Sequence, residues 1–393
     1  MMKMRYIMKI LRIEYKNLKL FKKKLVFDFT ATDRIVDIKQ VYKFSSNINF
    51  QKVIAIAGIN ATGKSLSLRL INFASKLLMD NTVLKDEKME FTLFQDQTEI
   101  IIDFVIAENI YRLRSVLGIK EITGEEIKIG YKLYFKNEVL YSKPIKSVKL
   151  KKGLFEWSSL QVFIERNLLE KNMLELLNDN HSIIIKLTKD IPLNIIALID
   201  NTNVNFLIDG IKYNNTFTNL FDDSIEKIEY ESEDNINLNF KDEKKSFNIN
   251  NLNDQYRLLS SGTIKGTLLL NTISLILKRG GYLIIDEIEV HLNKTLVEVI
   301  INLFMDEKIN KYGAVLIFTT HYVEILDIIT RKDAIYVSIR DENHKIQIEK
   351  FSDRIKRNDI KKSEVLLSNY FGDTAPKYRA IQNVRKLLCN ETN

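Results

Sequence analysis

One short stretch of this sequence has the residue types and spacing of a phosphate-binding loop. Residues 58–65 are Gly-Ile-Asn-Ala-Thr-Gly-Lys-Ser, which fits the pattern G-x-x-x-x-G-K-[ST]. The glycines permit a tight turn that points successive N–H groups at phosphate oxygens. Lys64 would neutralise the β- and γ-phosphates of a nucleotide, and the Ser65 hydroxyl would bind Mg²⁺. The predicted nucleotide-binding residues are Gly58, Ile59, Asn60, Ala61, Thr62, Gly63, Lys64, Ser65 and Leu66.

A pair of acidic residues ends a second apolar stretch. Residues 282–285 are Tyr-Leu-Ile-Ile, and they lead directly into Asp286 and Glu287. In P-loop enzymes an aspartate at a strand end holds Mg²⁺, and a carboxylate just after it can position the attacking water. The alternative is two surface acids after a buried strand, and the phosphate-binding loop earlier in the chain argues against it.

Two further features could complete such a site. Ser260, Ser261 and Gly262 open a long apolar helix, where a serine would cap the helix and its N-terminus would attract an anion. A chain with two phosphate cradles predicts a dimer with composite sites. His321 follows the apolar run 315–320. A histidine there is usually structural, but it could also contact a γ-phosphate.

Periodic patterns predict the elements that position these residues. Continuous apolar runs at 52–58, 282–288 and 314–321 are typical of strands buried on both faces. Helical spacing at 64–79 and 262–281 predicts a helix after the phosphate-binding loop and another after the Ser-Ser-Gly turn. The other predictions are two strands within 8–29, a β meander over 91–153, mainly helix over 158–200, short strands over 203–250, and a hairpin then helix in the tail after residue 330.

The order of these motifs resembles the ATP-binding-cassette (ABC) type of ATPase, and more narrowly the soluble clan that contains the SMC, RecF and OLD proteins. That resemblance implies ATP and Mg²⁺ as cofactors. It makes Lys64 and Ser65 part of Walker A, residues 259–262 the signature, and residues 289–293 the D-loop. Asp286 becomes the Walker B aspartate, Glu287 the catalytic glutamate and His321 the switch histidine.

The signature departs from the usual pattern at Ser261 and Thr263, where the family has glycine and glutamine. For the glutamine that completes the Mg²⁺ site we favour Gln161, with Gln95 and Gln97 as competitors.

The resemblance also implies an architecture. We expect an α/β fold: an ABC-type P-loop NTPase head with a mixed core sheet, an N-terminal antiparallel β lobe and an inserted α/β lobe. The predicted division is residues 1–110 for the first part of the head, 110–250 for the inserted lobe, 250–340 for the second part of the head, and 340–393 for a C-terminal extension.

The length of the insertion narrows the resemblance. The segment between Lys64 and Leu259 is too short for long coiled-coil arms and lacks sustained heptads. The tail resembles abortive-infection ATPases, with the ATPase component of PARIS-type defence as the nearest analogue. This implies a homo-oligomeric sensor, at least an ATP-dependent head-to-head dimer, that responds to a phage-derived trigger and controls a separate toxin or TOPRIM-type nuclease. The alternatives are a RecF-like DNA repair or replication ATPase and a nucleotide-gated scaffold without turnover.

Composition excludes several classes of protein. The 393 residues include a single cysteine, Cys389, so no disulfide can form within the chain. No apolar run is long enough to span a membrane, and no signal peptide is recognisable, so we expect a cytoplasmic location. The formal net charge is +8. The basic stretches 19–24 and 143–153 are candidate DNA contacts, although we favour a solvated edge strand for the second, with Val148 and Leu150 on one face.

Overall fold

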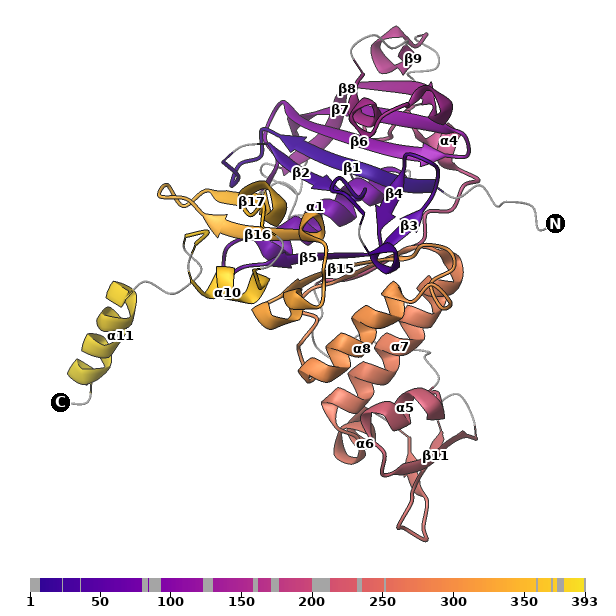
Figure 1. Ribbon diagram of the computed structural model, residues 1–393, viewed down its shortest axis with the longest axis vertical. Helices are drawn as coiled ribbons and strands as arrows, with labels where there is room; N and C mark the ends of the chain where they lie inside the picture. The colour runs from indigo at the N-terminus through magenta and orange to yellow at the C-terminus, as the bar shows by residue number, and fades with distance from the viewer. Residues whose placement is uncertain are drawn as a thin grey trace.

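The computed structural model describes residues 8–22, 24–35, 37–79, 84, 93–122, 130–157, 162–170, 177–199, 213–231, 235–250, 252–357, 360–368, 370–372 and 378–391. Two six-stranded sheets form its centre (Figure 1). This mixed α/β arrangement fits a P-loop NTPase, as expected from the sequence, whereas the predicted N-terminal and inserted lobes stay predictions.

The core sheet carries the predicted motif strands. Its order is β10-β14-β15-β5-β16-β17, and all neighbours are parallel except β16 and β17, which form the predicted hairpin. Every residue of β5, β14 and β15 is buried, which explains their continuous apolar sequences. The strands are β10 (Ile195–Leu198), β14 (Tyr282–Ile285), β15 (Val315–Thr320), β5 (Val53–Ala57), β16 (Ile335–Arg340) and β17 (Ile346–Lys350).

The second sheet is antiparallel throughout, in the order β2-β1-β6-β7-β8-β9. Helix α1 (Lys64–Leu77) lies between the two sheets (Figure 1), and its buried side chains belong to the same apolar cluster as residues of both. The Tyr15 hydroxyl of β1 donates to the Leu70 carbonyl of α1 at 2.6 Å. The strands are β1 (Met8–Lys16), β2 (Leu25–Asp28), β6 (Thr98–Ile106), β7 (Asn109–Ile122), β8 (Gly130–Pro144) and β9 (Val162–Glu165).

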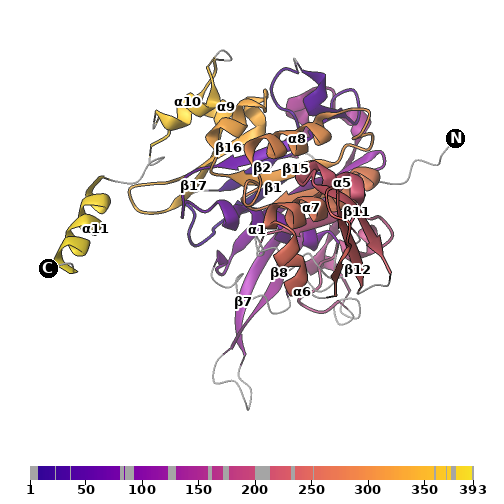
Figure 2. The same ribbon diagram turned by 90° about the horizontal axis from the view of Figure 1, so that it is seen from below.

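Two long helices cover the opposite face of the core sheet. Helices α7 (Ser261–Arg279) and α8 (Lys294–Met305) pack on it around a second apolar cluster (Figures 1 and 2). Helix α7 ends at Gly280, which adopts φ 70°. The carboxyl ends of β5, β14 and β15 lie at one edge of the core sheet. The first turn of α1 follows β5 along the chain, and the first turn of α7 contacts the loop after β14 through Ser261 and His291.

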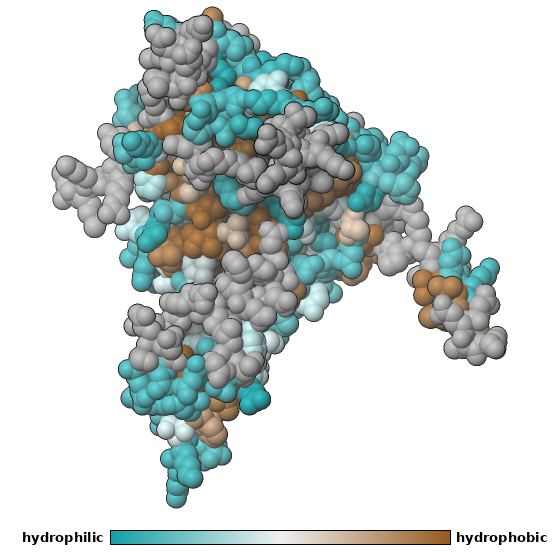
Figure 3. Space-filling model, turned by 180° about the vertical axis from the view of Figure 1, so that it is seen from behind, coloured by the Kyte–Doolittle hydropathy of each residue, from teal (hydrophilic) through white to brown (hydrophobic). Residues whose placement is uncertain are grey.

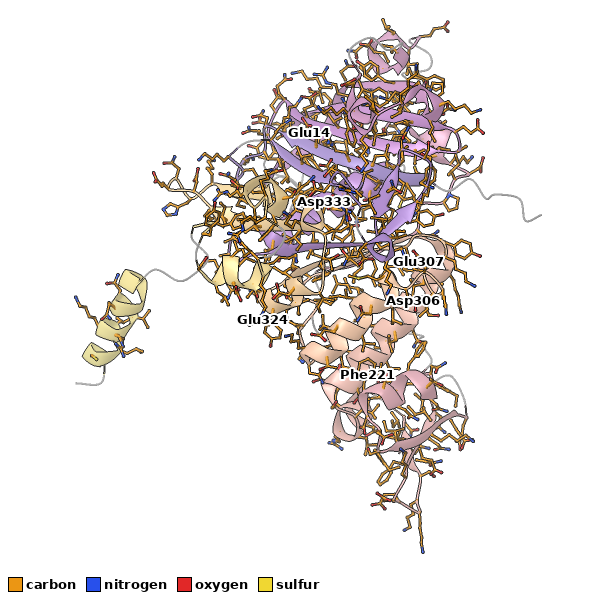
Figure 4. The ribbon with its side chains drawn as sticks, viewed as in Figure 1. Glu14, Phe221, Asp306, Glu307, Glu324 and Asp333 are labelled. Carbon is orange, nitrogen blue, oxygen red and sulfur yellow. The ribbon has the colours of Figure 1, made fainter. Side chains whose placement is uncertain are left out.

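A small antiparallel sheet lies beside the N-terminal end of α7 (Figure 1). Strands β11 (Ile225–Tyr230), β12 (Ile236–Phe240) and β13 (Phe247–Ile249) accompany helices α5 (Asn215–Phe221) and α6 (Leu252–Leu258). Phe221, labelled in Figure 4, packs on α7 where Gly266 leaves room, because a Cβ there would lie 2.2 Å from its ring. The glycine thus allows α5 to lie close against α7.

Buried hydrogen bonds and an ion pair join the segment after β2 to the segment before β16. Asp333 (Figure 4) is fully buried, and its Oδ2 accepts hydrogen bonds from Thr32 N at 2.8 Å and Asp33 N at 2.9 Å. Arg331 Nη2 donates to the same oxygen at 2.6 Å. These bonds hold the segment after β2 against the segment that leads into β16.

The remaining elements are short or peripheral. They are β3 (Val41–Lys43), β4 (Asn49–Gln51), α4 (Ile185–Thr188), α9 (Phe351–Arg354), α10 (Lys362–Leu367) and α11 (Tyr378–Glu391), with 3₁₀ turns η1 (Ile38–Gln40), η2 (Ile145–Ser147), η3 (Lys151–Phe155), η4 (Arg166–Leu168), η6 (Val323–Asp327) and η7 (Lys332–Ala334). Helix α11 lies apart from the rest, and Figure 3 shows apolar residues on its surface. Val384 and Leu387 of this helix are exposed. Among the described helices, none combines the length and apolarity that a membrane span requires.

Three predictions of local structure are wrong in whole or in part. Residues 203–250 contain the short strands β11, β12 and β13, as predicted, but also helix α5, which was not predicted. Residues 158–200 are not mainly helical: their described part contains β9, two short helical turns, and β10, which pairs with β14. The basic stretch 143–153 is not a strand beyond Pro144, because proline offers no N–H to a ladder and η2 and η3 follow it. Val148 is accordingly buried at 5% exposure, whereas Leu150 is 71% exposed.

The sheets divide the chain differently from the predicted lobes. Strand β7 begins at residue 109, and its residues 109–117 pair with β6, so the antiparallel sheet contains strands from both sides of the expected boundary at 110. Strand β10 belongs to the expected insertion but lies in the core sheet. The division at 110, 250 and 340 stays a prediction.

Candidate active site

The loop between β5 and α1 needs glycine at both predicted positions. Gly58 has φ 153°, and a Cβ there would lie 2.4 Å from the Ser338 carbonyl oxygen. Gly63 has φ 102°, and a Cβ there would lie 2.6 Å from Ile346 Cδ1. Both the left-handed backbone and the close approach of β16 and β17 therefore exclude a side chain.

The backbone N–H groups of this loop are available to an anion. Within the described part of the chain, the N–H groups of residues 60–66 have no hydrogen-bond acceptor, and the first N–H to find one is that of Ser67, which donates to Gly63 O at 2.9 Å. Unpaired N–H groups at a helix N-terminus carry partial positive charge. The loop therefore has the donors that a phosphate group requires.

Strand β16 braces the loop from one side. Ser338 Oγ donates to Thr62 O at 2.8 Å, and Arg340 Nε donates to Ala61 O at 2.6 Å. Thr62 Oγ1 also donates to Ile59 O at 2.8 Å, and Ala61 adopts φ 61°. The carbonyl groups are thus tied down on the outside of the loop. Ser338 and Arg340 were not predicted to contact the loop, because the sequence around them indicates only a strand.

Lys64 is buried and held by its own loop. Its ammonium donates to Gly58 O and Ile59 O, both at 2.9 Å, and lies 3.5 Å from His321 Nδ1. Burial lowers the pKa of this ammonium to about 8, and the nearby carboxylates, led by Asp286, oppose the shift only in part. A phosphate would offer this cation an anionic partner in place of two neutral carbonyls.

Thr319 joins the two predicted acids. The Thr319 hydroxyl donates to Asp286 Oδ1 at 2.5 Å and accepts a hydrogen bond from Glu287 N at 2.7 Å. Asp286 and Thr319 are both buried, whereas the Glu287 side chain is 37% exposed. Glu287 also adopts φ 49°, an uncommon backbone for a residue other than glycine. From the sequence we predicted that Thr319 lies in an apolar strand, but not that it bridges Asp286 and Glu287.

His321 connects the lysine and the glutamate. Its Nε2 lies 3.2 Å from Glu287 Oε1, and its Nδ1 faces the Lys64 ammonium. This arrangement suits the tautomer in which Nε2–H donates to the carboxylate and Nδ1 accepts. The backbone N–H of His321 donates to Glu289 Oε1 at 2.5 Å. The structure therefore brings together Lys64, Glu287 and His321 as the motif order predicts.

The start of α7 contacts the following loop rather than the phosphate-binding loop. Ser260 caps the helix by accepting from Thr263 N at 3.0 Å, as predicted. Ser261 Oγ lies 3.4 Å from His291 Nδ1, and a Cβ on Gly262 would lie 2.8 Å from His291 O. Ser260 and Ser261 are exposed. In the described part of the chain, no hydrogen bond joins residues 260–262 to residues 58–66.

Lys265 links α7 to the loop after Glu287. Its ammonium is buried and donates to Val290 O at 2.5 Å. Burial lowers the pKa of Lys265 to about 8, opposed by Glu289 and Glu287. We did not identify this residue from the sequence. Its signal was available, because Lys265 is the sole charged residue of the α7 sequence before Lys278.

The described residues place no predicted glutamine at this site. Gln161 lies outside the described residues. Gln95 donates to the Asn17 side chain and, through its backbone N–H, to Thr98 Oγ1 at 2.9 Å. Gln97 follows with φ 67°. Neither competitor has a hydrogen bond to Lys64, Asp286 or Glu287 in the part of the chain that is described.

The donor set fits Mg²⁺ as a partner of a bound phosphate. Asp286 Oδ2 has no hydrogen-bond partner among the described residues, so that oxygen is available as a ligand. Ser65 follows Lys64 in the first turn of α1. Mg²⁺ commonly takes one or two protein oxygens and completes its shell with water and phosphate oxygens. In the described part of the chain, no group of three or more His, Cys, Asp or Glu side chains is placed to hold a metal on its own.

Comparison with known proteins identifies a family. A protein-family model described as "AAA domain, putative AbiEii toxin, Type IV TA system" matches residues 53–327. The match begins at β5 and ends in η6, so it includes the phosphate-binding loop, α7, the acidic pair and His321. No curated protein matches the chain.

Proposed function

The chain belongs to this family of AAA-domain P-loop ATPases, and from that premise we propose that it hydrolyses ATP at a site completed by a second copy. The observation that carries the proposal is the meeting of Lys64, Glu287 and His321 beside a loop whose N–H groups lack acceptors. These groups match the charge distribution of a triphosphate and of the water that attacks it.

Each residue has a defined task in this proposal. The N–H groups of residues 60–66 and the Lys64 ammonium bind the β- and γ-phosphates. Glu287 orients the attacking water and accepts its proton. His321 contacts the γ-phosphate through Nδ1, the nitrogen that now faces Lys64, and Nδ1 must then carry a proton because a phosphate oxygen only accepts. Ser65 and Asp286 would hold Mg²⁺, which supplies charge neutralisation to the phosphates. Thr319 keeps both acids in place.

The second copy follows from the exposed start of α7. Ser260 and Ser261 expose a capped helix N-terminus to solvent, yet among the described residues no hydrogen bond joins residues 260–262 to the phosphate-binding loop of their own chain. A helix N-terminus binds anions well. We propose that residues 260–262 of one copy close over the γ-phosphate held by the other, as the ABC-type resemblance implies.

The Glu287→Gln variant tests this proposal. It removes the charge that activates water but preserves size, so ATP should bind and persist, and the dimer should accumulate. Light scattering after size exclusion should show the doubled mass with MgATP and the single mass without nucleotide. Glu298→Gln, an acid on α8 that pairs with Lys294 at 4.0 Å, is the matched control and should turn over ATP normally. A monomeric Glu287→Gln protein in saturating MgATP contradicts the composite site.

We further propose that ATP occupancy controls a separate toxic protein. The family description names a toxin–antitoxin system, which supports a paired effector. The proposed role is therefore a sensor of phage infection that restrains or releases a toxin or nuclease. Co-purification of this chain with the product of a neighbouring gene, before and after phage challenge, tests the pairing. A chain that purifies alone under both conditions, and whose loss leaves phage resistance unchanged, contradicts the role.

A further inference from the structure

A basic groove lies between two segments that are distant in sequence. The turn between β3 and β4 faces residues 145–156 across two adjoining hollows of about 540 Å³ and 430 Å³. Both hollows are lined by Asn47, so they adjoin each other at this residue. We call this surface the basic groove. It consists of residues 45–49 and 145–156 together with Arg12 and residues 30–32.

The lining of the basic groove is strongly positive. Its ionisable residues include a single acid, Glu156. The basic members are Arg12, Lys146, Lys149, Lys151 and Lys152. Such an imbalance along a concave surface concentrates positive potential and attracts anions.

Two of these cations have no ion-pair or hydrogen-bond partner among the described residues. Lys149 and Lys152 are exposed, and neither forms an ion pair or side-chain hydrogen bond with any described residue. Lys151 instead donates to Ala31 O and Asp33 O at 3.3 Å, and Arg12 pairs with Asp28 at 2.5 Å. The lining therefore contains both anchored cations that shape it and free cations that a ligand can engage.

The walls of the basic groove are held in place before any ligand arrives. Asn47 Nδ2 donates to Val148 O at 2.8 Å and Lys149 O at 3.3 Å, which ties one wall to the other. Lys143 Nζ donates to Gly153 O and Glu156 O, both at 2.8 Å, and so fixes the far end of the basic segment. A binding surface that is already ordered loses little entropy on binding.

We propose that the basic groove binds the phosphate backbone of a nucleic acid. The cations are spread over both hollows rather than gathered round one point, which suits a polyanion better than a single phosphate. The simplest alternative, lysines that protect an edge strand, requires a strand that residues 145–155 do not form. Contacts made by lysine ammonium groups to phosphates carry no sequence information, so binding should be independent of sequence.

Salt dependence gives a quantitative test. On duplex DNA each phosphate contact contributes a slope of about 0.9 in the logarithmic plot of affinity against salt, which is about eightfold in affinity between 1 M and 0.1 M salt. With the duplex, the double variant Lys149→Gln/Lys152→Gln should therefore lower the slope by about 1.8 and weaken binding about 60-fold at 0.1 M salt. With single strands the slope should fall by about 1.4. Fluorescence anisotropy with a labelled DNA duplex, single-stranded DNA and RNA of equal length measures both quantities.

Two further variants separate a local site from bulk charge. Lys244→Gln/Lys245→Gln removes the same charge from the exposed turn before β13, and it should bind nucleic acid like the wild type. Asn47→Ala keeps every charge but frees the wall at residues 148–149, so it should weaken binding without lowering the salt slope. ATP turnover without nucleic acid should be normal in all three, which keeps this test independent of the proposed ATPase function.

Two results would overturn the proposal. The first is a wild-type protein that binds none of the three nucleic acids at about 50 mM salt, where phosphate contacts are strong. The second is an equal loss of affinity in the variants at 149/152 and at 244/245, which would show that net charge alone attracts the probe. Binding of any one probe with the predicted difference between the two double variants supports the groove.

Discussion

The hydroxyl of Thr319 offers the sharpest test of how the two acids are held. Thr319→Val keeps the shape of the side chain but removes the atom that donates to Asp286 Oδ1 at 2.5 Å and accepts from Glu287 N at 2.7 Å. Thr319 is 0% exposed, so water cannot easily replace either bond. The variant leaves a buried carboxylate oxygen and a backbone N–H without partners.

The structure sets the size of the effect. A hydrogen bond to a charged group contributes about 1.5–3 kcal/mol, and an unsatisfied buried donor costs about 1–3 kcal/mol. Because the Glu287 side chain is partly exposed, we expect the lower part of each range and a total near 3 kcal/mol. For a chain of 393 residues, this lowers the melting temperature by about 4 °C. A displaced Glu287 should also reduce ATP turnover at least about tenfold, the equivalent of 1.4 kcal/mol in the barrier.

The neighbouring threonine provides a matched control. Thr320 is equally buried, but its hydroxyl accepts one bond, from Tyr322 N at 3.0 Å, and contacts neither acid. Thr320→Val should cost about 1 kcal/mol and lower the melting temperature by only about 1 °C, with turnover near normal. Differential scanning calorimetry and a steady-state phosphate-release assay measure both properties. If the two valine variants have the same stability and turnover, the proposed function of Thr319 is wrong.

Two further predictions concern the phosphate-binding loop. The pKa of Lys64 is lowered to about 8, and phosphate binds the protonated ammonium, so ATP affinity should fall by up to about tenfold per pH unit above that value. Calorimetric titration from neutral to alkaline pH measures this affinity, and Lys64→Arg should abolish its dependence on pH. A wild-type affinity that does not change with pH would exclude this function of Lys64. Gly63→Ala should lose ATP binding and about 1–3 kcal/mol of stability, because the added methyl group meets both a backbone of φ 102° and the side chain of Ile346. Gly372→Ala, at φ 75° with nothing within 4 Å of the added methyl group, is the control and should keep ATP binding. Equal ATP affinity in the two variants would mean that the loop tolerates a side chain.

Much of the fold was accessible from local patterns. The apolar runs that became β5, β14 and β15 were recognisable because strands buried on both faces need no polar residues. The glycine spacing at 58 and 63 was recognisable because only certain residues adopt such turns. The prediction for 158–200 failed because β10 is a strand through its pairing with β14, and periodicity within a short apolar segment does not distinguish that from helix.

The basic stretch after Pro144 shows the same limit on the surface. Alternation of Val148, Lys149, Leu150 and Lys151 is the pattern of a half-buried strand, yet Asn47 and Lys143 bind the carbonyls of this segment and hold it in turns. Those bonds join residues about a hundred positions apart in the first case. A pattern within ten residues contains no information about such partners.

The sequence by itself determined which ionisable residues belong to the candidate site, because the loop, the acidic pair and the histidine are each recognised from their neighbours along the chain. Tertiary structure alone decided how they are held: Thr319 bridges the acids, Ser338 and Arg340 brace the loop, and Lys265 ties α7 to Val290. These contacts form between strands and helices that pack side by side, and the sheet order that brings them together follows from the folding of the whole core.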